Sequence, residues 1–447
     1  MREFLTNLTK GRGRVFGSFE GSAPSLVVAE PDLLRDILVK DFHIFPYRNE
    51  MKTGDAIADK MRMRQISSIM NDCSQTLLKV CEKYSNKGEP VDVKGMFGAF
   101  TMDVIASSAF GTKVDSHNDP QNEFVRRARE AFLKFTPFVV MVSLLIPHWI
   151  LKLIPESINP CKLDKDNFFR DVTLSVIKQR KETGRRYNDF LQLLMDAADE
   201  AEQTENQETV EDETDRFGSI TFSETSVSAK YRKLSNNELL AQCILFFFVG
   251  YETTAAMLSF ITYSLATNPE WQEKLIKEVD EAFEKHGEMS YDAVREMKIL
   301  DAVVSETLRM HPTGASTGRT AIEDYELGNT GIVIKKGMNV IIPTYVMHYN
   351  PDFFEDPGTF NPERFMEGYE PKHPQYAYLP FGAGPRNCLG MRFALLEIKM
   401  CISNLFRHFR VKPHTTTKIP VEYKKGSVLL SVSELPLLVE KRTEVKS

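Results

Sequence analysis

The apolar positions in the first part of the chain change from a strand pattern to a helical one. Short runs rich in β-branched and aromatic residues at 15–20 and 25–29 predict two strands with Gly21 at the turn, and Pro31 opens a helix after them. From 91 to about 192, apolar residues mostly recur every three or four positions, which predicts helices. A small N-terminal sheet followed by a largely helical region is therefore expected.

The second half of the chain has the pattern of longer helices. The apolar body of 236–267 predicts one long helix, and two more helices are expected over 269–286 and 300–310, the last of which Pro312 ends. Alternating and β-branched residues at 328–345 then predict a return to strand. The expected fold class is mainly α with a minor sheet.

Two segments differ from this pattern. Residues 138–154 form the most apolar stretch, and Pro147 interrupts it, so it is either a buried pair of helices or a patch that dips into a membrane surface. Residues 199–215 contain nine acidic residues and no basic one. Because they also lack an apolar period, we expect a solvated linker over 199–230.

Composition and charge narrow the class of protein. The 447 residues are 42% hydrophobic, enough for a large core, and a net charge of -6 gives no general electrostatic reason to expect nucleic acid as a partner. The six cysteines form no C-x-x-C pair and no zinc-type spacing with histidine, which favours free thiols in a reducing compartment. The first residues have the pattern of neither a signal peptide nor a membrane span, so no spanning segment is expected there.

The strongest chemical signal is a cysteine in a glycine-dense loop that leads into a helix predicted over 391–406. A thiol at a helix N-terminus loses its proton more easily, because backbone N–H groups and the helix dipole favour the anion. Glycines let the backbone approach a flat cofactor, Phe381 can cover one side of it, and Arg386 can pair with an acidic substituent. Chance agreement of six such residue types is on the order of one in a hundred million windows, so a merely structural cysteine is a weak alternative. The loop reads Phe381-Gly382-Ala383-Gly384-Pro385-Arg386-Asn387-Cys388-Leu389-Gly390.

Two further motifs carry polar groups on apolar helices. Glu252 and Thr253 lie in the middle of the long helix, where a carboxylate needs a partner or a function. Taken alone, such a pair is usually a capped or solvated turn. Glu306 and Arg309 share a helix face at a spacing of three residues and can pair, and Arg364 follows in a P-E-R-F segment.

The pattern F-x-x-G-x-R-x-C-x-G, from 381 to 390, resembles the haem-binding signature of cytochromes P-450. The resemblance implies a single domain over 1–447 with the mainly α cytochrome P-450 fold, in which haem b lies between the long central helix and the cysteine loop. It also implies that Cys388 is the axial thiolate and metal ligand, whose electron donation favours O–O cleavage. The residues that it assigns to the haem site are Cys388, Phe381, Gly382, Arg386, Gly390 and Arg319.

The same resemblance gives roles to the polar motifs. Thr253 would be the hydroxyl donor and Glu252 the relay acid that bring protons to bound dioxygen. A buried network that fixes the loop beneath the haem would consist of Glu306, Arg309 and Arg364, a structural role. The substrate pocket would be lined by Leu245, Phe248, Val249, Thr313, Ala315 and Ser316.

The resemblance covers nearly the whole chain and is closest to the microsomal drug-metabolising branch that includes thromboxane synthase, as 97–105 and 189–194 indicate. It implies insertion of one oxygen atom from O2 into a lipophilic small molecule, with electrons from an NADPH-dependent flavoprotein reductase and cytochrome b5 as a further partner. The implied location is the cytoplasmic face of the endoplasmic reticulum membrane, with 138–154 as a peripheral contact. Relatives begin with a membrane-spanning anchor, whereas this chain starts almost at its first strand.

One element of the family is missing from the sequence. A W-x-x-x-R element that binds the haem and helps to dock the reductase should follow 45–50 within a few dozen residues, yet the only tryptophans are Trp149 and Trp271. We therefore infer an internal deletion around 51–70, with the arginines at 62 and 64 as the nearest candidate substitutes.

Three alternatives to monooxygenation remain open. The inferred deletion favours a truncated or inactive paralogue with impaired haem binding. A lipid-peroxide isomerase of the same fold would need neither reductase nor proton relay, and the retention of Glu252 and Thr253 argues against it. A protein that only binds lipophilic molecules would leave the cysteine loop unexplained.

Overall fold

The computed structural model describes residues 2–20, 23–47, 63–119, 121–133, 168–187, 189–200, 236–366, 373–425, 427 and 429–443. Its α-helices are α1 (Arg2–Thr9), α2 (Pro31–Arg35), α3 (Met63–Lys87), α4 (Val93–Phe110), α5 (Glu123–Leu133), α8 (Phe168–Thr183), α9 (Phe190–Glu200), α10 (Asn236–Thr267), α11 (Pro269–His286), α12 (Tyr291–Glu296), α13 (Lys298–Met310), α14 (Thr344–His348) and α15 (Met391–His408). Its strands are β1 (Val15–Glu20), β2 (Ala23–Val28), β3 (Val91–Asp92), β4 (Thr317–Thr320), β5 (Tyr325–Glu326), β6 (Val333–Ile334), β7 (Asn339–Ile342), β8 (Phe409–Pro413) and β9 (Pro436–Lys441). Shorter helical turns are η1 (Asp36–Lys40), η2 (Phe42–Ile44), η4 (Pro362–Phe365) and η5 (Gly384–Arg386). The expectations for 51–62, 138–154 and 201–230 concern residues outside these ranges.

The long helices begin and end where local sequence dictates. Pro269 occupies the first turn of α11, where a missing N–H does no harm, and Gly287 ends that helix in the left-handed conformation at φ 74°. The predictions of helices over 236–267, 269–286 and 300–310 are confirmed by α10, α11 and α13. The expected fold class, mainly α with small sheets, is confirmed as well.

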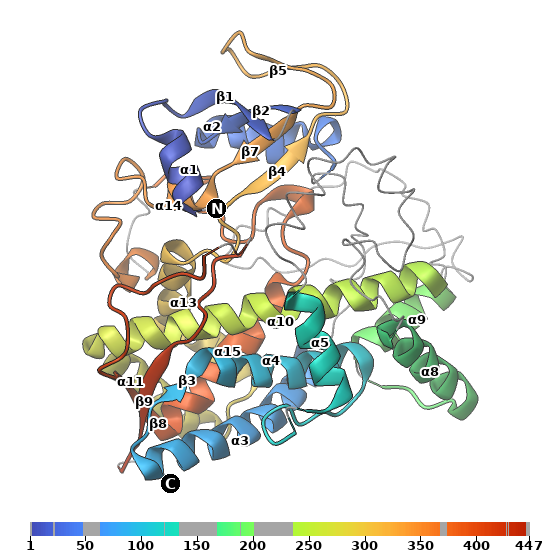
Figure 1. Cartoon of the computed structure of the whole chain (residues 1–447), viewed down its shortest axis with the longest axis vertical. Helices are drawn as coiled ribbons and strands as arrows, with labels where there is room; N and C mark the ends of the chain where they lie inside the picture. The colour runs from blue at the N-terminus through green and yellow to red at the C-terminus, as the bar shows by residue number, and fades with distance from the viewer. Residues whose placement is uncertain are drawn as a thin grey trace.

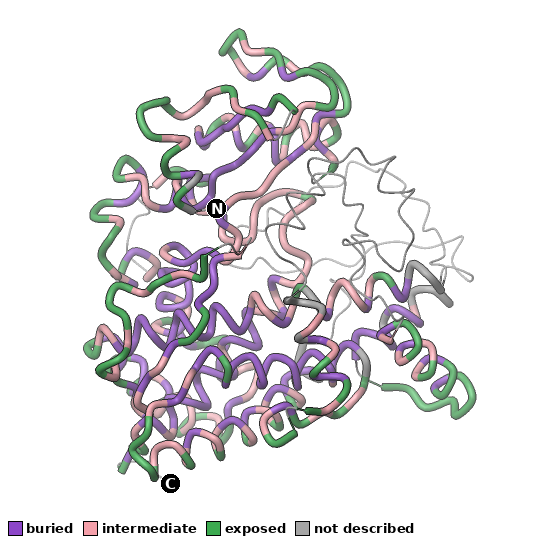
Figure 2. Tube along the Cα trace, viewed as in Figure 1, coloured by how far each residue is buried: buried purple, intermediate pink, exposed green. Residues whose placement is uncertain are grey.

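The central helix α10 runs through the middle of the helical part and packs against α4, α15 and α13 (Figure 1). Residues 239–267 of this helix are long and apolar enough to cross a membrane by length and composition, but over half of its most apolar window is buried inside the fold. Figure 2 shows the same helix and its neighbours α4 and α15 as largely buried, with exposed residues concentrated in the outer loops. α10 is therefore apolar on most sides because other helices surround it.

A four-stranded sheet joins the start of the chain to residues far along it. β1 and β2 form the predicted antiparallel hairpin, with Val15 opposite Val28. β2 then pairs in parallel with β7, which pairs with β4 on its other side. The segment 328–345, predicted as strand, divides into β6, β7 and the start of α14. A second hydrophobic core lies against this sheet, and it combines residues 26–45 with residues 321–379.

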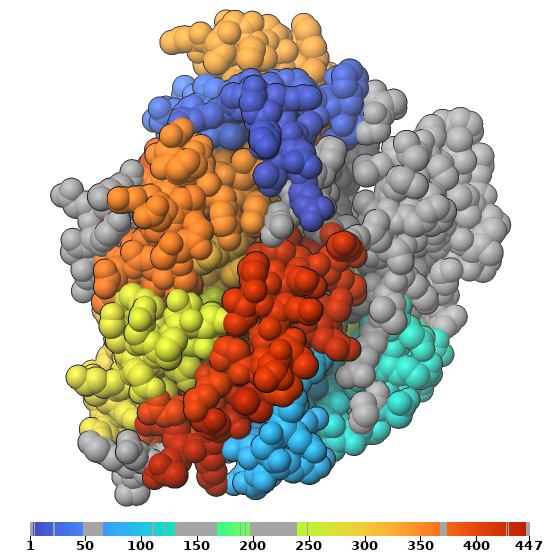
Figure 3. Space-filling model, turned by 60° about the vertical axis from the view of Figure 1, so that its left-hand side comes forward, coloured from blue at the N-terminus to red at the C-terminus, as the bar shows by residue number. Residues whose placement is uncertain are grey.

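Several elements were not expected from the sequence, among them the helices α1 and α3 and a second sheet near the C-terminus. In that sheet β8 pairs antiparallel with β9, and β9 pairs with the short strand β3. The C-terminal segment therefore returns to the beginning of α4. On the face in Figure 3, the C-terminal residues, in red, lie between the dark-blue N-terminal part and the light-blue region of α3 and α4.

Candidate functional site

Cys388 lies at the end of a tight loop directly before α15. Its backbone N–H donates to the carbonyl oxygen of Phe381 at 2.8 Å. Gly382 and Gly384 adopt φ angles of 74° and 73°, in the left-handed region that favours glycine. A Cβ atom on Gly384 would also collide with the backbone oxygen of Leu38. The backbone of the loop is therefore fixed by conformational demands that only glycine meets without strain.

The start of α15 is anchored to the central helix. Phe393 packs edge-to-face against Phe246 of α10, with ring centroids 5.5 Å apart. Cys388 and Phe381 are both half-buried and pack against the helical core. The thiol is therefore held at the edge of the core, five residues before a side chain that packs on α10.

The other described cysteines are poor candidates for an anionic ligand. Burial raises the pKa of Cys73, Cys81 and Cys243 to about 12. It also raises the pKa of Cys401 well above its usual value. These thiols stay protonated near neutral pH. The sixth cysteine, at 161, lies outside the described residues.

Two arginines bring positive charge to the cysteine loop. Arg319, on β4, is fully buried, and it donates to the carbonyl oxygen of Arg386 at 3.2 Å. Arg386 in turn donates from Nε to the carbonyl oxygen of Pro46 at 3.0 Å. Carboxylates pair strongly with guanidinium groups, so this side of the loop suits an acidic cofactor substituent.

Glu252, in the middle of α10, has two partners from distant parts of the chain. Its Oε2 accepts a hydrogen bond from Nζ of Lys94 at 2.9 Å, and its Oε1 accepts one from Oγ of Ser431 at 2.8 Å. Thr253 is half-buried and donates within its own helix, to the carbonyl oxygen of Val249 at 2.7 Å. The carboxylate is therefore held towards α4 and the C-terminal segment. Sequence reasoning identified Glu252 but gave no indication of Lys94 or Ser431.

On α10, the residues predicted to line a pocket differ in exposure. Val249 is 51% exposed, although its helix forms the centre of the core. Leu245 is half-buried. The side chain of Phe248 lies outside the described residues. An exposed apolar side chain on a core helix is the kind of surface that a lipophilic ligand covers.

After α13, the three predicted pocket residues also differ. Thr313 and Ser316 are half-buried. Ala315 is only 2% exposed and belongs to a small apolar cluster with Tyr345 and Leu430. This arrangement leaves Ala315 almost no surface for a substrate, because the cluster covers it.

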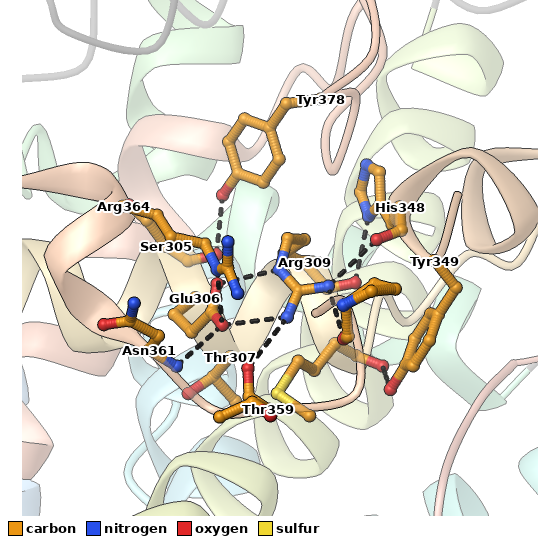
Figure 4. Close-up of polar contacts among 12 residues, drawn as sticks. Ser305, Glu306, Thr307, Arg309, His348, Tyr349, Thr359, Asn361, Arg364 and Tyr378 are labelled. Atoms are coloured by element: carbon orange, nitrogen blue, oxygen red, sulfur yellow. Dashed lines mark hydrogen bonds and ion pairs between the residues drawn. The ribbon is translucent and has the colours of Figure 1, made fainter. Parts of the chain in front are cut away.

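Glu306, Arg309 and Arg364 lie together in a buried network, in which only Arg364 keeps a little exposed surface (Figure 4). Arg309 donates from Nε and Nη2 to the two carboxylate oxygens of Glu306, each at 2.8 Å. Glu306 also accepts from the backbone N–H of Asn361 at 2.9 Å, and Nε of Arg364 lies 3.6 Å from it. The remaining Nη1 of Arg309 donates to the carbonyl oxygens of His348 and Pro357, both at 2.9 Å. Because the opposite charges are paired and hydrogen-bonded, the free-energy cost of burying them is offset.

Comparisons with known proteins give the family of the chain. A family model described as Cytochrome P450 matches residues 55–439, and the chain belongs to the cytochrome P450 family. Its class is therefore that of a cytochrome P450 monooxygenase, as predicted. The chain is 34% identical to Cytochrome P450 3A5 of Homo sapiens over 98% of this chain and 87% of that protein. It is 35% identical to Cytochrome P450 3A18 of Rattus norvegicus, over 96% of this chain and 86% of that protein, and 32% identical to Cytochrome P450 3A11 of Mus musculus, over 98% and 86%.

The alignment with the human relative contains a further indication. It spans 466 positions, more than the 447 residues of this chain. The alignment therefore contains gaps within this chain, and the internal deletion inferred from the sequence stays a prediction. Its location around 51–70 stays a prediction, because 51–62 lie outside the described residues.

The family implies haem held by a cysteine thiolate, and the residues present suit that group. Cys388 is a half-buried thiol at the N-terminus of α15, the position at which a sulfur anion is favoured. A Cβ on Gly390 would meet no protein atom within 4 Å, so the backbone there is open to close approach by a flat ring. Arg319 supplies a buried cation beside the loop, and Val249 supplies apolar surface on α10.

Proposed function

We propose that this chain is a haem-thiolate monooxygenase that inserts one oxygen atom from O2 into a lipophilic small molecule. Electrons come from NADPH through a flavoprotein reductase, with cytochrome b5 as a further partner. The observation that carries the proposal is Cys388, a half-buried thiol in a glycine-fixed loop at the start of α15 and against the helical core. In this proposal Cys388 ligates the iron of haem b.

The residues around Cys388 have distinct tasks in this proposal. When bound, haem supplies the iron that activates dioxygen. Gly382 and Gly390 let the backbone lie close to the ring, and Phe381 covers one side of it. Arg319 and Arg386 pair with the acidic substituents. The apolar substrate lies against the pocket residues Leu245, Phe248, Val249, Thr313 and Ser316, with Ala315 behind them.

Proton supply is the task proposed for Glu252 and Thr253. Lys94 and Ser431 hold the Glu252 carboxylate by 2.9 and 2.8 Å hydrogen bonds. Thr253 lies next to it, and its hydroxyl group can exchange the Val249 carbonyl oxygen for another acceptor. A relay of this kind moves one proton at a time between groups within hydrogen-bond reach.

Replacing Lys94 with methionine tests how Glu252 is held. The ion pair is only slightly exposed, with 10% and 24% of the two side chains accessible. Its loss should lower the free energy of unfolding by about 2 kcal/mol, since hydrogen bonds to charged groups contribute that much. The yield of oxidised product per NADPH consumed should also fall. Lys94→Arg keeps the cation and should stay close to the wild type in both measurements, so equal losses in the two variants would contradict this role.

The cytoplasmic face of the endoplasmic reticulum membrane is the location we propose. Residues 138–154 are the apolar segment available for a peripheral contact, although they lie outside the described residues. Flotation of the purified protein with phospholipid vesicles, compared between the wild type and a variant with two charged residues in 138–146, would measure this contact.

One spectrum tests the proposed function. The purified protein, reduced with dithionite and exposed to carbon monoxide, should show the red-shifted Soret band of thiolate-bound haem. A band at the position of a neutral ligand, with full haem occupancy, would overturn Cys388 as the ligand.

A second candidate, an inactive paralogue with impaired haem binding, is motivated by the absence of a W-x-x-x-R element shortly after residues 45–50. Haem stoichiometry separates the two. Near-full occupancy supports the monooxygenase, whereas a small fraction of haem-loaded protein after expression with excess haem precursor supports the paralogue.

A further inference from the structure

One histidine connects the buried Glu306–Arg309 network to the segment that leads to Cys388. His348 is the last residue of α14 and has no exposed surface. Its Nδ1 lies 3.1 Å from the carbonyl oxygen of Arg309, and its Nε2 lies 2.9 Å from the backbone nitrogen of Leu379. The ring is thus in contact with two segments that are 70 residues apart in the sequence.

The two partners determine where the proton of His348 lies. The backbone N–H of Leu379 can only donate, so Nε2 must be the acceptor. The carbonyl oxygen of Arg309 can only accept, so the proton is on Nδ1 and is donated to it. A neutral imidazole with this one tautomer satisfies both groups. A second hydrogen bond joins the same two residues, because Nη1 of Arg309 donates to the carbonyl oxygen of His348.

Backbone hydrogen bonds continue from Leu379 to the cysteine. Gly382 donates its N–H to the carbonyl oxygen of Leu379 at 3.2 Å, which closes a tight turn. Cys388 donates its N–H to the carbonyl oxygen of Phe381, inside the same turn, at 2.8 Å. The orientation of Leu379 therefore affects the position of the backbone that carries the sulfur.

We propose that His348 is a positioning residue that fixes the Cys388 loop to the Glu306–Arg309 network through the Leu379 N–H. This role rests on the proposed function, in which Cys388 holds the haem. The neighbouring Tyr378 supports it, because its ring stacks on His348 with centroids 5.3 Å apart and its hydroxyl donates to the carbonyl oxygen of Ser305 at 2.9 Å. Two consecutive residues of this segment, 378 and 379, are thus tied to the part of the fold that holds Glu306.

Acid should weaken this connection. Burial lowers the pKa of His348 to about 3, and the positive charge of Arg309 contributes. The titratable groups that face the ring are Arg309 on α13 and Tyr378 and His373 on the segment before the loop. Because the folded pKa lies below the unfolded value of 6.5, the contribution of His348 to stability is complete above pH 6.5 and is lost as the pH falls towards 3. The difference in unfolding free energy between the wild type and His348→Gln, measured across this range, should shrink with falling pH; a constant difference would contradict the neutral ring.

Three variants separate positioning from general stability. His348→Asn places its amide near the position of Nδ1, so it retains the bond to Arg309 and leaves the Leu379 N–H without an acceptor. His348→Gln places its amide near the position of Nε2 and can still accept from Leu379. Tyr349→Phe is the matched control, since it removes one buried hydrogen bond, from the Tyr349 hydroxyl to the carbonyl oxygen of Met310 at 3.1 Å, from the same end of α13.

The readouts are the carbon monoxide spectrum and hydrogen exchange of residues 376–388 in the protein as purified. In His348→Asn, the ratio of haem bound by the thiolate to haem that has lost the thiolate should fall roughly tenfold, because one buried N–H is left without an acceptor. Exchange in 376–388 should rise in the same variant. His348→Gln should restore both towards the wild type, and Tyr349→Phe should change neither.

The inference is overturned if His348→Asn and Tyr349→Phe give the same haem spectrum and the same exchange rates. It is also overturned if neither His348→Asn nor His348→Gln can be purified. A wild type without the thiolate band overturns the proposed function instead, while the exchange result still tests the role of His348.

Discussion

Replacement of Cys388 with serine should abolish the thiolate-type carbon monoxide band and the oxidation of lipophilic substrates. A serine hydroxyl stays protonated near neutral pH, so it donates far less charge to iron than a sulfur anion does. The loop itself should persist, because its turn depends on the glycines at 382 and 384 and on the backbone bond between 381 and 388. The spectrum of reduced protein and product formation with NADPH and reductase check this result.

A second cysteine provides the matched control for this replacement. Cys73 is half-buried like Cys388, but it lies on α3 and burial raises its pKa to about 12. Cys73→Ser should therefore keep the spectrum and the activity of the wild type. If Cys388→Ser kept both as well, the assignment of the ligand would be wrong.

Replacement of Arg309 with methionine should destabilise the fold by about 3 to 5 kcal/mol, the effect of leaving one charge of a buried pair uncompensated. Both side chains of the pair have no exposed surface, and Glu306 would keep only the Asn361 N–H and the more distant Arg364. Unfolding in denaturant, monitored by circular dichroism of the haem-free protein, measures the loss. Haem retention should fall with it, because the carbonyl groups that Arg309 holds belong to α14 and the segment around 357.

An exposed ion pair provides the comparison for this prediction. Lys178 and Glu182 are 3.9 Å apart on α8, with 78% and 64% of their side chains exposed. Such pairs contribute little, since solvent screens them and holding two flexible side chains costs entropy. Lys178→Met should leave the unfolding midpoint nearly unchanged. Similar midpoints for Lys178→Met and Arg309→Met would show that the buried network does not stabilise the fold.

The features that could be predicted from the sequence are local along the chain. The length of the apolar run at 236–267 was sufficient to predict α10, because strands are much shorter than 32 residues. The pairing of Glu306 with Arg309 follows from their spacing on one turn. The cysteine loop is contiguous, so its glycines and its thiol could be recognised together.

The features that were missed depend on contacts between distant segments. Nothing near Lys94 or Ser431 in the sequence indicates Glu252 as their partner, since tertiary packing brings the three together. The contact of His348 with Leu379 is of the same kind. Ala315 packs against Tyr345 and Leu430 from other parts of the chain, which no local pattern could indicate, and its place in the substrate pocket stays a prediction.

The cysteine loop also touches the beginning of the chain, and this has a consequence for biosynthesis. Gly384 is in contact with the backbone of Leu38, Arg386 donates to Pro46, and β2 pairs with β7. A nascent polypeptide on the ribosome exposes residues 15–46 long before residues 339–390 emerge. The early strands and turns therefore cannot form these contacts until translation is nearly complete. Assembly of the cofactor site is therefore a late event, and substitutions around Leu38 should impair haem capture in cells although they lie about 350 positions before the sulfur.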